Sequence, residues 1–269
     1  AQRQACRPQP ARTCSRHRLC RVLSETECIG VPALLLRPTV VLSGTNPASA
    51  GMLGMTIVTI PSDARGNVDV NALKAQCDDT VVGMMLTNPN TLGLFDENIE
   101  QVVKLVHDCG GVMYGDGADL NALLGIVRPG DLGFDLMHFN LHKTFAVPHG
   151  GGGPGSGPVG ASSRLADYLP APLIGVVEEG DDDTPPLFGY VIPKQSIGRM
   201  KAFHGHFGGG MVRAYTYIAM HGPDGLKDIS QYAVLNANYL KAKLEKHYTV
   251  PFNRTCMHEF VMEGRFEGS

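Results

Sequence analysis

A regular alternation of strand-like and helix-like segments between residues 55 and 140 is the feature that most constrains the fold. Short apolar runs predict strands at 55–60, 80–87, 112–116 and 134–140. Helices are predicted between them, at 69–76, 95–111 and 118–127. Such a βαβαβ series predicts an α/β fold with a mostly parallel sheet between helices, whose ligand sites lie at the carboxyl ends of the strands.

Polar side chains follow three of these predicted strands. Asn88 comes after the second strand, Asp116 ends the third and Lys143 follows the fourth. A lysine amine can form a Schiff base with the aldehyde of pyridoxal phosphate, and a buried carboxylate can keep the pyridine nitrogen protonated. One helix and one strand separate Asp116 from Lys143, so both can reach the same sheet edge. The pattern indicates pyridoxal phosphate chemistry.

Each of these residues also has a structural interpretation. Lys143 could be a surface lysine in a loop, and Asp116 could cap a helix that begins near Ala118. His142 could be a solvated loop histidine, or it could bind the cofactor phosphate. The residue types alone leave these alternatives open.

A glycine-rich run follows Lys143, with six glycines between residues 150 and 157. Such a segment has almost no side-chain surface to bury, so it predicts a loop that permits close backbone approach or needs positive φ angles. It does not match the phosphate-binding GxxxxGK[ST] motif, because no lysine follows these glycines.

Composition excludes several classes of protein. The 269 residues are 43% hydrophobic and 18% charged, which suits one large α/β domain or two smaller ones. A formal net charge of -3 and a pI near 6.4 give no electrostatic reason to expect nucleic acid binding. No apolar run approaches the roughly 20 residues of a spanning helix, so we expect a soluble protein with no membrane partner.

The cysteines predict neither a disulfide framework nor a metal site. There are seven, an odd number, and the four within the first 28 residues lack zinc-site spacing. Residues 1–40 are rich in arginine before the first acidic residue, Glu25, which suits a mitochondrial presequence. Against this, Pro8 and Pro10 interrupt any amphipathic helix, so we leave this segment unassigned, with disordered or mistranslated sequence as the alternatives.

Several longer motifs together resemble the glycine decarboxylase P-protein of the glycine cleavage system. They are "GTNPASA" (44–50), "GNVDVNALK" (66–74), "MLTNPNTLGLFDENI" (85–99), the segment from "YGDGADLNALL" to "LHKTFAVPHGGGGPGSGPVG" (114–160), "SIGRMKAFHGHFG" (196–208) and "VLNANYLKAKL" (234–244). The resemblance covers residues 44 to about 261, and it is greatest to the second subunit of the split bacterial form. A fragment of such a protein is implied.

The resemblance implies a fold-type-I, aspartate-aminotransferase-like enzyme that binds pyridoxal 5'-phosphate. By motif, Lys143 carries the cofactor as a Schiff base, Asp116 pairs with the pyridine nitrogen and Ala118 lies against a ring face. His142 would contact the phosphate. Asn88 would lie beside the ring hydroxyl, and Thr45 of "GTNPASA" is included among the cofactor-binding residues.

The implied reaction is decarboxylation of glycine, with transfer of the aminomethyl group to the lipoyl arm of H-protein. The implied partners are glycine, lipoylated H-protein, and another P-protein subunit or a second copy of the chain. The glycine run could line the entrance for the lipoyl arm. The alternatives are a non-catalytic fragment that keeps the fold, or another fold-type-I decarboxylase or aminotransferase. A bacterial protein would be cytoplasmic and a eukaryotic one would lie in the mitochondrial matrix.

The sequence also departs from the family pattern. Ser43 stands where the family has a histidine that stacks on the cofactor ring, and the upstream glycine-rich phosphate loop has no counterpart in residues 1–40. We expect a large cofactor-binding domain at 41–195. A helical segment at 196–269 would lead into an incomplete C-terminal domain.

Overall fold

The computed structural model describes backbone and side chains for residues 49–50, 53, 55–148, 156–200 and 209–264. For residues 32–36 and 207–208 it describes the backbone alone.

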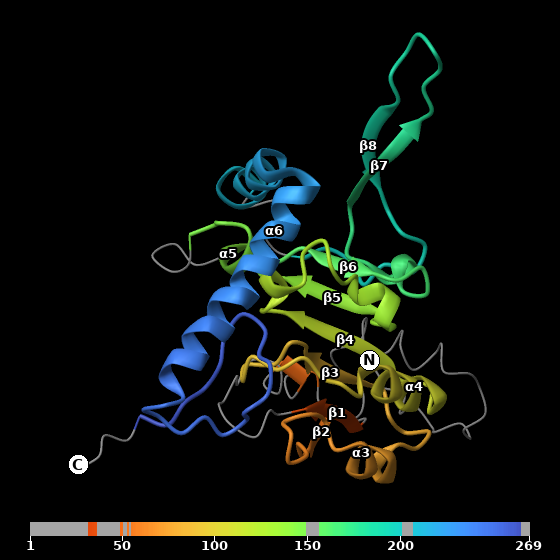
Figure 1. Cartoon of the computed structure of the whole chain (residues 1–269). Helices are drawn as coiled ribbons and strands as arrows, with labels where there is room; N and C mark the ends of the chain where they lie inside the picture. The colour runs from red at the N-terminus through yellow and green to blue at the C-terminus, as the bar shows by residue number, and fades with distance from the viewer. Residues whose placement is uncertain are drawn as a thin grey trace.

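A six-stranded sheet forms the centre of the fold (Figure 1). Its strands lie in the order β2-β1-β3-β4-β5-β6. They are β1 (Pro32–Leu36), β2 (Thr56–Ile60), β3 (Gly83–Thr87), β4 (Val112–Gly117), β5 (Leu136–Phe139) and β6 (Val159–Ala161). The neighbouring pairs from β2 to β5 are parallel, and only β6 pairs antiparallel.

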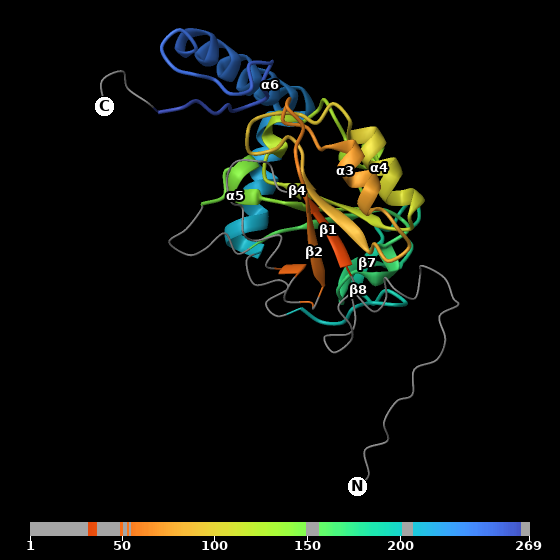
Figure 2. The same cartoon turned by 90° about the horizontal axis from the view of Figure 1, so that it is seen from below.

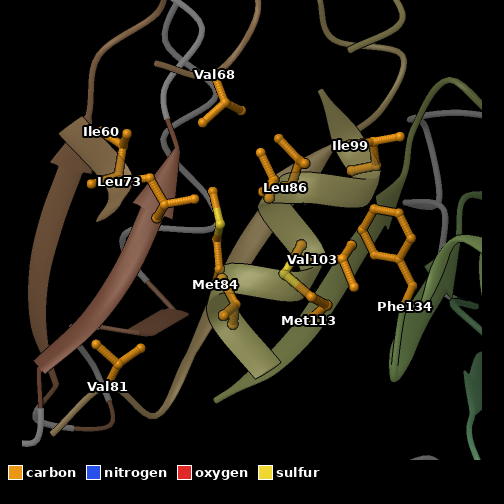
Figure 3. Packing of buried hydrophobic residues seen from close by; sticks show 12 residues of the cluster. Ile60, Val68, Leu73, Val81, Met84, Leu86, Ile99, Val103, Met113 and Phe134 are labelled. Atoms are coloured by element: carbon orange, nitrogen blue, oxygen red, sulfur yellow. The ribbon is translucent and has the colours of Figure 1, made fainter. Parts of the chain in front are cut away.

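Two helices cover one face of this sheet, α3 (Val70–Gln76) and α4 (Ile99–Asp108) (Figure 2). Asp69 caps α3 by accepting the N–H groups of Asn71 and Ala72, which satisfies donors that a helix start leaves open. A single apolar stripe on α4 faces the sheet, as its sequence predicts. Together they enclose the larger core cluster (Figure 3), which consists of Ile60, Val68, Leu73, Val81, Met84, Leu86, Ile99, Val102, Val103, Val106, Met113 and Phe134.

The opposite face is covered by the short helix α5 (Leu141–Thr144) and by α6 (Val212–Leu244) (Figure 2). A second core cluster lies there, made of Leu120, Leu123, Met137, Leu141, Phe145, Val147 and Ala214. The α6 ribbon contains a break at Gly222, whose φ of 62° is not helical and which precedes Pro223. No helix among the described residues is both long and apolar enough to cross a membrane.

The remaining elements are short. They are the 3-10 turns η1 (Leu120–Ala122), η2 (Pro129–Leu132) and η3 (Ala166–Tyr168), the π turn η4 (Phe207–Met211) and the hairpin of β7 (Leu173–Glu178) and β8 (Leu187–Val191). The hairpin projects away from the sheet (Figure 1) and exposes large apolar side chains, among them Phe188 and Tyr190. This hairpin was not predicted from the sequence.

The strands predicted at 55–60, 80–87, 112–116 and 134–140 are all present, within a few residues of their expected bounds. The helix predicted over 118–127 is wrong, because only η1 forms there. Gly125 has a φ of +67°, and a Cβ at this position would press on the side chain of Lys227 in α6. Close packing against α6 therefore overrides local helix propensity. The strand β1 falls within residues 1–40, which the sequence analysis left unassigned.

Candidate active site

The polar positions at the predicted strand ends lie at one edge of the sheet. Thr87, the last residue of β3, pairs with Asp116 of β4, and Asp116 pairs in turn with His138 of β5. Asn88 follows β3 directly, and Lys143 belongs to α5, which begins shortly after β5 ends. Strand order and register therefore bring the three segments that carry Asn88, Asp116 and Lys143 to the same edge, which is the usual ligand-binding edge of a parallel sheet.

The Asp116 carboxylate is mostly buried, and its Oδ1 atom is close to three nitrogen atoms. Oδ1 accepts the backbone N–H of Ala118 at 2.9 Å and lies 3.2 Å from Nε2 of His138. The side-chain amide of Asn140 is 3.5 Å from the same oxygen. The Ala118 contact is a turn contact of the kind that the helix-cap interpretation predicts, although no α-helix follows. A turn role and a cofactor role are compatible, because a carboxylate can accept several hydrogen bonds.

Lys143 is exposed on α5, while the helix itself is fixed by buried neighbours. Leu141 and Thr144 are both buried, and Leu141 belongs to the second core cluster. Burial raises the pKa of Glu259, and the positive charges of His258 and Lys143 oppose that shift. Glu259 therefore lies within electrostatic range of the Lys143 amine.

Asn88 has a buried side-chain amide, and only its oxygen has a hydrogen-bond partner among the described residues. Its Oδ1 atom accepts the backbone N–H of Asp96 at 3.0 Å. Its Nδ2 atom is buried, and within the described part of the chain it has no hydrogen-bond partner. A buried donor without a partner is uncommon, so Asn88 has an N–H group to offer a ligand. Asn88 and Asp116 also line one small pocket.

Of the other positions discussed in the sequence analysis, two lie near Asp116 or Lys143 and two lie outside the described residues. Ala118 is buried beside Asp116, and His142 is half-buried next to Lys143 in α5. Thr45 and Ser43 lie outside the described residues, so their roles stay predictions.

Three residues near Asp116 were not identified from the sequence. Tyr114 and Asp116 lie on the same face of β4, and His138 and Asn140 follow the same alternation along β5. The Tyr114 hydroxyl is 2.7 Å from Nδ1 of His138. The alternation was visible in "VMYGD" and "FDLMHFN", but which residues become neighbours depends on strand register.

A second polar group lies at the same end of the sheet. Asp119, His258 and Glu259 each offer one ligand atom, and these atoms lie within 4.8 Å of one another. Nε2 of His258 is 3.4 Å from Oδ1 of Asp119, and the other Asp119 oxygen is buried without a hydrogen-bond partner among the described residues. No metal site is expected from the sequence, and no local pattern reveals this group, because it joins residues far apart in the chain.

The C-terminal segment that carries His258 is attached to the β3–α4 loop. The Met257 N–H donates to the carbonyl of Gly93 at 2.7 Å. Arg254 donates to Asn67 and to the carbonyl of Phe95, each at 3.0 Å. These long-range contacts bring His258 and its neighbour Glu259 to the strand ends.

Gly93 has a φ of +75°, and a Cβ on it would overlap the carbonyl oxygen of Glu259. We expect Gly93→Ala to lower the free energy of unfolding by about 2 kcal/mol or more, because strain and overlap add. Urea denaturation measures this change. Gly130→Ala is the matched control, since a Cβ at Gly130 meets nothing within 4 Å. Equal stability of the two variants would contradict this attachment, and faster amide exchange at Met257 in the Gly93 variant would support it.

The sequence profile of the family described as "Glycine cleavage system P-protein" matches residues 47–267. The chain belongs to this family. The match includes every predicted site residue except Thr45. It agrees with the resemblance found from the motifs.

Curated members of the P-protein family are similar to the chain over most of its length. "Probable glycine dehydrogenase (decarboxylating) subunit 2" of Caldanaerobacter subterraneus subsp. tengcongensis is 55% identical over 226 residues, which cover 84% of this chain and 45% of the relative. The protein of the same name from Staphylococcus epidermidis is 53% identical over 224 residues, covering 83% and 43%. The chain thus spans less than half the length of these relatives.

Solved structures share the fold. A glycine decarboxylase (P-protein) of the glycine cleavage system, in inhibitor-bound form, superposes with a TM-score of 0.72 at 19% identity, covering 92% of this chain and 56% of that one. A C-DES mutant with glycine covalently linked to its PLP cofactor gives a TM-score of 0.61 at 16% identity, covering 88% and 62%. The expected fold-type-I architecture of PLP-dependent enzymes is confirmed.

Proposed function

We propose that this chain provides the pyridoxal phosphate site for glycine decarboxylation in the glycine cleavage system. The observation that carries the proposal is the register of β3, β4 and β5, which brings a buried carboxylate and an exposed amine to one sheet edge in a chain of the P-protein family. Lys143 would attach the cofactor covalently, and Asp116 would face its ring nitrogen.

The residues present fit this cofactor. It needs an accessible primary amine, an acceptor for the ring N–H and a donor near the ring hydroxyl. Lys143 is exposed, Asp116 is a mostly buried carboxylate and the Asn88 Nδ2 group is buried with no partner among the described residues. Ala118, which has a small side chain, is buried beside Asp116. His142 is the candidate for phosphate contact, and Thr45, which lies outside the described residues, is a further candidate cofactor-binding residue.

When bound, the cofactor supplies an electron sink that stabilises the negative charge left on glycine after loss of CO₂. Asp116 would hold a proton on the ring nitrogen, because an ionised carboxylate favours the protonated partner. Asn88 would donate its N–H near the ring hydroxyl. Glu259, which lies near Lys143, is a group through which the proton on the lysine amine could be exchanged.

The partners follow from the same proposal. Relatives named as subunit 2 support a second subunit for this chain. Lipoylated H-protein would accept the aminomethyl group. Most of the glycine run at 150–157 lies outside the described residues, so its expected place at the entrance for the lipoyl arm stays a prediction. In a bacterium the protein would act in the cytoplasm.

A second function is favoured by the wider fold comparison. The apo structure of cysteine desulfurase from Thermococcus onnurineus NA1 superposes with a TM-score of 0.58 at 17% identity, covering 95% of this chain and 62% of that one. The site could therefore serve another amino-acid reaction of this cofactor. The choice of substrate separates the two functions.

Titration of the purified chain with pyridoxal phosphate tests the proposal. We expect an absorption band near about 420 nm that disappears on borohydride reduction, with the added mass on the peptide that contains Lys143. Glycine, rather than cysteine or alanine, should perturb this band. Attachment at another lysine would contradict the site, and a response to cysteine alone would favour the second function. Absence of any band would favour a non-catalytic fragment.

A further inference from the structure

Three polar side chains lie in a row beside the candidate cofactor site. They come from the adjacent parallel strands β4 and β5. The Tyr114 hydroxyl is 2.7 Å from Nδ1 of His138, and Nε2 of His138 is 3.2 Å from Oδ1 of Asp116. The tyrosine and histidine rings also lie in contact, with centroids 5.7 Å apart. His138 thus has one ring nitrogen beside a phenol and the other between a carboxylate and the Asn140 amide.

Tyr114 and Asp116 favour one arrangement of the His138 proton. Burial, and secondarily the Asp116 charge, raises the pKa of Tyr114 to about 12, so its hydroxyl keeps its proton at neutral pH. If that hydroxyl donates to Nδ1, the proton of the neutral imidazole is on Nε2 and points to Asp116. The opposite tautomer would set an Nε2 lone pair against a carboxylate oxygen, which is repulsive.

Asn140 is the third neighbour of the His138 ring. Its Nδ2 atom lies 2.9 Å from Nε2 of His138 and 3.5 Å from Oδ1 of Asp116. As placed, this N–H group suits an unprotonated Nε2, so the Nε2–H tautomer requires the amide to turn and present its oxygen, which has nearly the same shape as its nitrogen. The orientation of Asn140 therefore differs between the two tautomers.

We propose that His138, supported by Tyr114, is a positioning residue for Asp116 that keeps its carboxylate ionised and oriented toward the ring nitrogen of the cofactor. This inference rests on the proposed function. A hydrogen bond donated to Oδ1 favours the charged carboxylate and fixes its rotation. A well-oriented, ionised Asp116 is what keeps the ring nitrogen protonated. His138 acts only through Asp116.

The first test concerns the chain without cofactor. Uniform ¹⁵N-histidine labelling and long-range ¹H–¹⁵N spectra distinguish the two neutral tautomers, and the His138 signal is assigned by its loss in His138→Gln. We expect the Nε2–H tautomer in the parent chain and a mixture of tautomers in Tyr114→Phe. A dominant Nδ1–H tautomer in the parent would overturn the proposal.

The second test uses pyridoxal phosphate labelled with ¹⁵N at the ring nitrogen, whose chemical shift reports protonation directly. We expect His138→Leu to shift this signal toward the unprotonated value and to weaken cofactor affinity by about tenfold, the size expected for one hydrogen bond to a charged group. His138→Gln should retain most of the parent's shift, because its amide N–H can replace Nε2–H. Tyr114→Phe should fall between the two.

His107→Gln is the matched control. His107 also pairs with a buried carboxylate, at 2.8 Å from Asp135, but on α4 and away from the strand ends. It should leave the ring nitrogen signal unchanged. If His138→Leu lowers thermal stability without moving that signal, His138 is merely structural and the positioning role is refuted. If the parent chain binds no cofactor, the proposed function itself fails, and the role of His138 fails with it.

Discussion

Replacing Lys143 with alanine is expected to abolish covalent attachment of pyridoxal phosphate and to leave the fold intact. The Lys143 side chain is exposed, and the buried neighbours Leu141 and Thr144 fix α5 without it. Loss of the amine removes the only group that this proposal assigns to the Schiff base. The absorption band near about 420 nm and the borohydride-stable mass increase should both disappear, while the unfolding midpoint should change little.

Lys104→Ala is the matched control for this substitution. Lys104 is also exposed and pairs with Asp108 on α4. Its replacement should leave the cofactor band unchanged and cost less than about 1 kcal/mol of stability. A Lys143→Ala chain that keeps the band would show that Lys143 is only a surface lysine.

Replacing Asp116 is expected to have the second large effect. Asp116→Ala should leave some cofactor bound, but it should lower glycine-dependent CO₂ exchange by several orders of magnitude, about a thousandfold or more. The physical reason is that the ring nitrogen loses the charge that keeps it protonated. Exchange is measured with the partner subunit and H-protein present.

Asp116→Asn separates the two roles of this residue. An asparagine oxygen can still accept the Ala118 N–H, so the local turn is preserved. The negative charge is absent, so cofactor chemistry should fall as it does in Asp116→Ala. If Asp116→Asn were as active as the parent, the turn contact would be the whole function of Asp116.

The order of the elements between residues 55 and 117 and the position of the candidate site were predicted from the sequence. Apolar runs with period two or with full burial identify strands, and the polar residues that interrupt them mark the strand ends. Asp116 and Lys143 were predicted as site residues in this way, and the resemblance of the motifs to the P-protein implies their roles. The helix predicted at 118–127 failed because Gly125 must pack against α6, a contact that no local pattern contains.

The remaining parts of the site depend on long-range contacts. His138 becomes a neighbour of Asp116 only through the register of β4 and β5, because a shift of one residue would turn its ring to the other face of the sheet. His258 and Glu259 reach the strand ends only because Met257 binds Gly93 and Arg254 binds the loop before α4.

The sequence by itself therefore determined the sheet class, the strand ends and the amine and carboxylate that they carry, since these depend on local periodicity. The tertiary structure alone decided which side chains support that carboxylate and which approach the amine. Those neighbours are set by strand pairing and by close backbone contacts between segments far apart in the chain.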